Sequence, residues 1–139
     1  MRTPAAHGPR LLVAALLFAL ALVAGACSGA AAAERVTISI GYSAFEPPQL
    51  TVPAGVPVRF VLVNGDPIDH EWIVGDGAVH EAHRSGTEMA HAARPTEVSI
   101  PALTTVETTV TFDAPGLYPY ICHLPGHEAY GMVGLLIVE

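Results

Sequence analysis

The stretch that decides how this chain folds is DAPGLYPYICHLPGHEAYGM, residues 113–132. A Pro-Gly turn opens it, and residues 117–122 read as a short β-strand. A tight loop then spaces Cys122, His127 and Met132 as C-x4-H-x4-M. A thiolate, an imidazole and a thioether on one loop form a soft donor set, which suits a transition metal such as copper.

Outward from this stretch, the chain reads as short β-strands divided by proline and glycine. The runs with period-two or β-branched patterns are residues 36–40, 50–52, 58–63, 72–74, 97–100, 104–112, 117–122 and 132–138. No segment after residue 35 carries a sustained helical stripe of apolar residues. Seven or eight short strands in about 105 residues predict an all-β fold, an antiparallel Greek-key sandwich.

Residues 76–95 (DGAVHEAHRSGTEMAHAARP) break this rhythm because they are polar and rich in histidine. We expect a long His-rich loop before the later strands, with one or two helical turns at residues 79–84. His80 and His83 are three apart, which would put both on one side of a helical turn. Three interpretations stay open: a solvated loop, a partner-docking loop, and a weak second Cu(II) or Zn(II) site made by His80, His83 and His91.

The C-terminal loop offers one suitably placed histidine, so a complete metal site needs another from a distant part of the chain. His70 is the best candidate because it follows the turn Asn64-Gly65-Asp66-Pro67 and begins an apolar strand. Two histidines, one cysteine and a long axial methionine make the trigonal arrangement of a blue-copper site.

The C-terminal stretch, with an early histidine after an asparagine-containing turn, resembles the cupredoxins, the type 1 or blue copper proteins. The resemblance covers about residues 36–139. It implies a cupredoxin-like sandwich around one copper ion, with His70 and His127 as imidazole ligands. Cys122 would then be the thiolate ligand and Met132 the axial one.

The run Cys122-His123-x3-His127-x4-Met132 is also similar to the C-terminal motif of the multicopper oxidases. In those enzymes histidines flank the cysteine and bind a trinuclear cluster, whereas Ile121 precedes it here. That cluster also needs His-x-His pairs, and this chain contains none. We therefore expect His123 to point outward, accessible to solvent, on a candidate electron path.

The N-terminus predicts export. Residues 11–26 are apolar and uncharged, follow two arginines and end in small residues, as in a secretory signal peptide. A membrane-spanning anchor is the alternative, but this run is shorter than the roughly 20 residues such a helix needs. We expect a signal peptide at residues 1–26, a tether at 27–35 and the copper-binding domain at 36–139.

Two cleavage positions stay open. The run Val23-Ala24-Gly25-Ala26-Cys27 resembles a bacterial lipobox, although Ala24 stands where leucine is usual. Lipidation of Cys27 would tether the protein to a membrane surface without spanning it. The alternative is ordinary signal-peptidase cleavage within Ala30 to Ala33. Either way Cys122 is a lone thiol in an oxidising compartment, which a bound metal would protect.

Charge limits the partners. Removing residues 1–26 deletes two arginines and no acidic residue, so four basic groups face thirteen acidic ones, a net charge of −9. This surface disfavours nucleic acid and anionic membranes. It favours a basic protein partner or a cation, or it serves solubility alone.

These observations predict an exported, monomeric, mononuclear copper protein that exchanges electrons with a redox protein. The sequence shows no phosphate loop, dinucleotide fingerprint or Ser-His-Asp candidate, so we expect no enzyme. A copper carrier or chaperone stays open as an alternative. So does a small copper enzyme with an open coordination position, because Glu71 and Glu128 stand beside proposed ligands.

Lipidation at Cys27 has a direct test. Expressed with its own signal in a bacterial host, the protein should partition into detergent, because an acyl chain adds apolar surface. The variant Cys27→Ala should release it in soluble form. A wild-type protein that is already soluble and begins near Glu34 would contradict the lipobox interpretation.

Overall fold

The computed structural model describes residues 33–86 and 94–139. The expected signal peptide, Cys27 and His91 therefore lie outside the described residues. Within the described part, no helix is both long enough and apolar enough to cross a membrane.

The described residues form nine strands and one helix, a content that agrees with the predicted all-β class. The elements are β1 (Glu34–Gly41), β2 (Ala44–Glu46), β3 (Gln49–Val52), β4 (Pro57–Asn64), β5 (His70–Val74), α2 (Gly77–Ser85), β6 (Glu97–Ile100), β7 (Thr105–Thr111), β8 (Gly116–Ile121) and β9 (Val133–Val138). The eight predicted runs correspond to every strand except β2, whose three residues are too few to show an alternating pattern.

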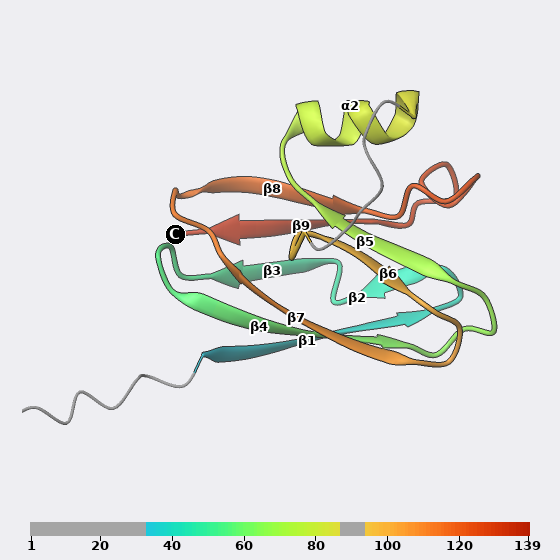
Figure 1. Ribbon diagram of the computed structural model, residues 1–139, viewed down its shortest axis with the longest axis horizontal. Helices are drawn as coiled ribbons and strands as arrows, with labels where there is room; N and C mark the ends of the chain where they lie inside the picture. The colour runs from blue at the N-terminus through green and yellow to red at the C-terminus, as the bar shows by residue number, and fades with distance from the viewer. Residues whose placement is uncertain (1–32, 87–93) are drawn as a thin grey trace, which may run out of the picture. The chain divides into compact units, whose positions relative to one another are not determined.

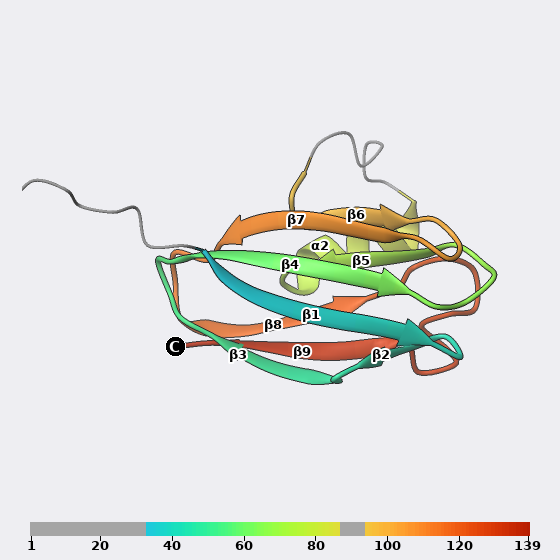
Figure 2. The same cartoon turned by 90° about the horizontal axis from the view of Figure 1, so that it is seen from below.

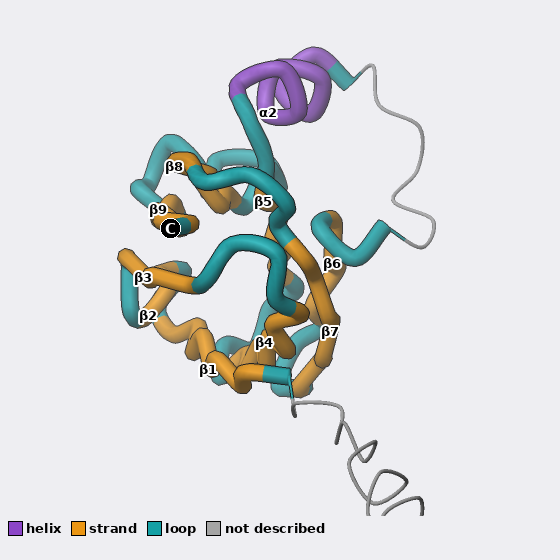
Figure 3. The backbone as a smooth tube through the Cα atoms, turned by 90° about the vertical axis from the view of Figure 1, so that its left-hand side faces the viewer, coloured by secondary structure: helices purple, strands orange, loops and turns teal. Residues whose placement is uncertain are grey.

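Two sheets enclose the core as a sandwich (Figures 1 and 2). Their strand orders are β2-β1-β4-β7 and β3-β9-β8-β5-β6. Figure 3 looks along the strands, which surround the core. Alternate positions of the strands face inward: Ile38 and Ile40 of β1 are buried, whereas their neighbours Thr37 and Ser39 are exposed.

Two strand pairings differ from the antiparallel expectation. β1 pairs with β4, and β3 pairs with β9, in parallel. Parallel neighbours need a long connection. The chain provides one for β1 and β4 because it first forms β2 and crosses to the other sheet as β3. The remaining pairings are antiparallel, so the predicted sandwich class holds while the sheets are mixed.

The expected His-rich loop contains a longer helix than the one or two turns predicted. Asp76 caps α2 by accepting hydrogen bonds from two backbone N–H groups of its first turn, and Gly86 ends it in the left-handed conformation. The buried residues of α2 are His80 and His83, so its inner face carries imidazoles in place of aliphatic side chains. Figures 1 and 3 place α2 beside the sheet that contains β8 and β5.

The contact between Gly134 and Tyr120 is a sensitive point of the core. Tyr120 is fully buried, and its hydroxyl donates to the Pro47 carbonyl oxygen at 2.7 Å. A Cβ atom on Gly134, the cross-strand partner of Tyr120, would overlap the tyrosine ring.

We predict that Gly134→Ala lowers the free energy of unfolding by about 1–3 kcal/mol, the usual cost of overpacking. Chemical denaturation measures it. Gly41→Ala is the matched control in β1, because its added Cβ meets no atom within 4 Å. That control should change stability by less than about 0.5 kcal/mol. Equal effects of the two variants would contradict the packing argument.

Candidate metal centre

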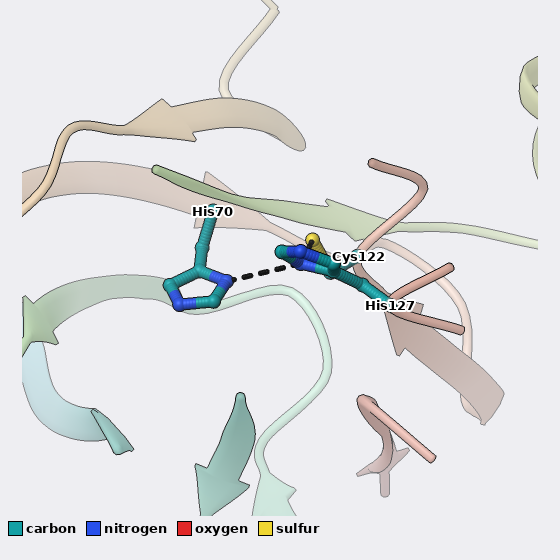
Figure 4. Close-up of side chains that lie close together, drawn as sticks. All are labelled: His70, Cys122 and His127. Carbon is teal, nitrogen blue, oxygen red and sulfur yellow. Dashed lines mark hydrogen bonds between the residues drawn. The ribbon is translucent and has the colours of Figure 1, made fainter. Parts of the chain in front are cut away.

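Three of the four predicted ligands meet at one end of the sandwich. His70 begins β5, Cys122 directly follows β8, and His127 lies in the loop between β8 and β9. One ligand atom from each lies within 4.8 Å of the others, the one such group of three among the described His, Cys, Asp and Glu residues. His127 Nδ1 lies 3.2 Å from His70 Nδ1 and 3.2 Å from Cys122 Sγ. Figure 4 shows the three side chains close together.

Backbone hydrogen bonds hold the fourth ligand, Met132, in the same loop. The Cys122 N–H donates to the Met132 carbonyl oxygen at 3.2 Å, and the Met132 N–H donates to the His127 carbonyl oxygen at 3.0 Å. Gly126 and Gly131 turn the loop with φ angles of 87° and 94°, which glycine adopts without strain. Met132 and Cys122 are both fully buried, so the two sulfur ligands are shielded from water.

Asp66 orients the His70 ring. Its Oδ2 lies 3.0 Å from His70 Nε2, so this nitrogen donates its hydrogen and Nδ1 keeps its lone pair toward the other ligands. The carboxylate also accepts from the backbone N–H groups of Tyr42 and Ser43, each at 2.7 Å. Burial acts to raise the pKa of Asp66, but the Ser43 and Tyr42 N–H groups and His70 outweigh it and hold that pKa below its usual value.

Asn64, at the predicted turn, supports Asp66 in turn. Its side-chain oxygen accepts from the Asp66 N–H at 2.9 Å, and its amide nitrogen donates to the carbonyl oxygens of Ile68 and Pro101. The turn before His70 was predicted from the sequence, but the role of Asp66 was not. The available signal was the position of an acidic residue four residues before the histidine.

Burial keeps both the Cys122 thiol and the His127 ring uncharged while no metal is bound. Burial raises the pKa of the Cys122 thiol, although the backbone N–H groups of Glu71 and Leu124 act against it. The Glu71 N–H lies 3.4 Å from Sγ. Burial, and next the neighbouring His70, lowers the pKa of His127. A neutral imidazole therefore faces a thiol whose proton a metal ion would displace.

The donor set fits copper. Two imidazole nitrogens, a thiolate sulfur and a buried thioether combine borderline and soft ligands, which both copper oxidation states accept. The Glu128 carboxylate, next to His127, is engaged elsewhere: it pairs with Arg84 at 2.6 Å and lies 3.4 Å from His123 Nδ1.

The expectation that His123 is accessible to solvent is wrong. Its side chain is only 5% exposed. It lies against α2, where its Nε2 is 3.0 Å from His80 Nδ1 and its ring stacks on that of His83 at 5.2 Å between centroids. The sequence missed this because nothing local to residue 123 indicates that a segment some 40 residues earlier covers it.

Comparison with known proteins agrees with the geometry. Residues 32–139 match the profile of the family described as copper binding proteins, plastocyanin/azurin family. The chain belongs to the plastocyanin/azurin family of copper-binding proteins. Its site is the single type 1 copper site of such a protein, formed by His70, Cys122, His127 and Met132.

Several members of the family are similar to this chain. The copper-resistant cuproprotein CopI of Rubrivivax gelatinosus is 37% identical over 99 residues, which are 68% of this chain and 59% of that protein. Auracyanin-A of Chloroflexus aurantiacus is 34% identical over 162 residues, covering 94% of this chain and 97% of that protein.

Solved structures agree as well. The structure of auracyanin A, described as a "blue" copper protein from Chloroflexus aurantiacus, has a TM-score of 0.58 at 30% identity and covers 76% of this chain and 98% of its own. A structure of auracyanin B has a TM-score of 0.64 at 29% identity and covers 77% of this chain and 89% of its own. These likenesses confirm the predicted cupredoxin-like sandwich and blue-copper family.

The Asp66–His70 contact predicts an effect on redox potential. Asp66→Asn removes a negative charge beside a copper ligand. The affinity of the site for Cu(II) should therefore fall about 10- to 100-fold, and its affinity for Cu(I) should fall by a smaller factor. Each tenfold difference between the two ions raises the potential by about 59 mV. Cyclic voltammetry of the copper-loaded protein measures it.

Asp69→Asn is the matched control, because the Asp69 carboxylate accepts from the Ala102 N–H on the protein surface. The control should keep the wild-type potential. A potential in Asp66→Asn equal to that of the control would show that the carboxylate does not tune the site.

Proposed function

We propose that this type 1 copper protein carries single electrons between redox proteins. The observation that carries this proposal is the buried, hydrogen-bonded arrangement of the ligand loop. Cys122 and Met132 are fully buried, and the backbone N–H groups of both donate within the ligand loop. A site whose ligands stay in place in both oxidation states exchanges electrons with little rearrangement, which suits a carrier.

The two histidine ligands differ in their exposure to solvent. When bound, copper supplies a one-electron couple between Cu(I) and Cu(II). His70 is buried and held by Asp66, whereas His127 is partly exposed. Electrons would therefore enter and leave through the His127 ring, which gives the shortest route from the surface to the site.

Copper tolerance is the second candidate function. The observation in its favour is the 37% identity to a protein described as a copper-resistant cuproprotein. A protein in that role would bind copper and release it, or keep it from harmful reactions. An enzymatic role has less support, because the Glu128 carboxylate pairs with Arg84 and the fourth ligand is a buried methionine.

We further propose that the protein works outside the cytoplasm, held at a membrane surface through Cys27. The apolar segment at residues 11–26 and the lipobox-like run before Cys27 support this. Its acidic surface favours a redox partner with a basic docking face.

One pair of measurements separates the two functions. An electron carrier should show a reversible one-electron wave in voltammetry and keep its copper against a strong Cu(I) chelator in both oxidation states. A copper carrier should lose Cu(I) to the chelator within seconds to minutes. Rapid loss of copper on reduction would overturn the electron-transfer proposal. Cys122→Ser serves as the control that should lose the thiolate absorption band.

A further inference from the structure

A second cluster of histidines lies outside the type 1 site. It brings together His80 and His83 of α2 with His123, the residue after the thiolate ligand. His80 Nδ1 lies 3.0 Å from His123 Nε2. His80 is 2% exposed, His83 is 9% exposed and the His123 side chain is 5% exposed. Three buried imidazoles in one place need a chemical explanation.

The hydrogen-bond partner of His80 decides which of its nitrogens carries the hydrogen. Its Nε2 lies 3.2 Å from the Pro119 carbonyl oxygen. A carbonyl oxygen can only accept, so Nε2 is the donor. In the neutral ring, Nδ1 then holds a lone pair, and this lone pair points at His123.

The same reasoning applies to His123 from the other side. Its Nδ1 lies 3.4 Å from Glu128 Oε2, and Arg84 holds that carboxylate in place at 2.6 Å. When the ring hydrogen sits on Nδ1, facing this carboxylate, Nε2 holds the lone pair. In that tautomer two lone pairs converge across 3.0 Å, and one metal ion can bind both; with the hydrogen on His123 Nε2, the same contact is a hydrogen bond to His80 Nδ1.

A metal ion satisfies this arrangement better than a proton. Burial lowers the pKa of His80, which opposes an added proton. Two nitrogens bound at about 2.0–2.1 Å to one ion, at roughly a right angle, are about 3 Å apart. The separation of 3.0 Å between the two nitrogens matches that geometry.

His83 adds a third imidazole of the same kind. Its Nδ1 lies 2.8 Å from the Val79 carbonyl oxygen, so this nitrogen donates and Nε2 carries the lone pair. His80 and His83 thus each direct one N–H to a carbonyl oxygen, and His123 Nδ1 faces a carboxylate at 3.4 Å. Histidines that bind metal ions show this same arrangement.

We propose that His80 Nδ1 and His123 Nε2 bind a second metal ion, a borderline divalent cation, beside the third imidazole of His83. Cu(II) is favoured over Zn(II) because nitrogen ligands without a thiolate follow the general order of affinities. The site lacks a sulfur ligand, so bound Cu(II) would show no intense thiolate band. It differs from the group expected from sequence, His80, His83 and His91, in using His123.

The test starts from the protein with its type 1 site filled with copper. Cu(II) is then added, and electron paramagnetic resonance follows a second signal with the wide hyperfine splitting of nitrogen-ligated copper. One further Cu(II) per chain should bind, and His80→Ala should remove it while the blue band remains. Binding of no further Cu(II), or binding that survives His80→Ala, would overturn the proposal.

Matched variants guard against a folding defect and against surface binding. Glu128→Gln removes the negative charge that faces His123 Nδ1 and should weaken the second Cu(II) about 10- to 100-fold. Glu81→Gln removes another acidic neighbour of Arg84, at 3.7 Å, and should leave affinity unchanged. His91→Ala should also bind as the wild type does. Loss of the second Cu(II) in His91→Ala, or equal weakening by both glutamine variants, would contradict the assignment to His80 and His123.

Discussion

The type 1 site depends on two backbone hydrogen bonds that close one loop. The Cys122 N–H donates to Met132, and the Met132 N–H donates to His127, so three ligands share one small ring of chain. β8 and β9, which pair on either side of this loop, fix its ends. The donor atoms are thus already close to one point, so metal binding costs little conformational entropy.

The fourth ligand comes from another part of the fold, and a carboxylate sets its orientation. Asp66 receives the His70 ring hydrogen together with two backbone N–H groups of the turn after β1. The first turn of the domain is thereby connected to the metal centre. A change in that turn would reach the copper potential through one charged hydrogen bond, because a ligand's outer partner controls its basicity.

The short helix α2 has an unusual inner face. It meets the sheet through His80, which contacts Pro119 and His123, and through the Arg84–Glu128 ion pair. Carbonyl oxygens orient the His80 and His83 rings here as Asp66 orients His70. The peptide bond between Cys122 and His123 joins the two clusters, so an ion bound in one would be sensed at the other.

Local patterns were enough to predict the strands and the C-x4-H-x4-M loop, since alternation and ligand spacing are properties that neighbouring residues fix. His70 was predicted from the turn before it, the apolar strand after it and the resemblance to the cupredoxins. The family match and the geometry confirm these predictions. Only the tertiary structure decided the parallel pairings, the role of Asp66 and the burial of His123. These depend on contacts between segments far apart in the chain. His123 meets His80 across 43 positions, a distance at which no local pattern carries information.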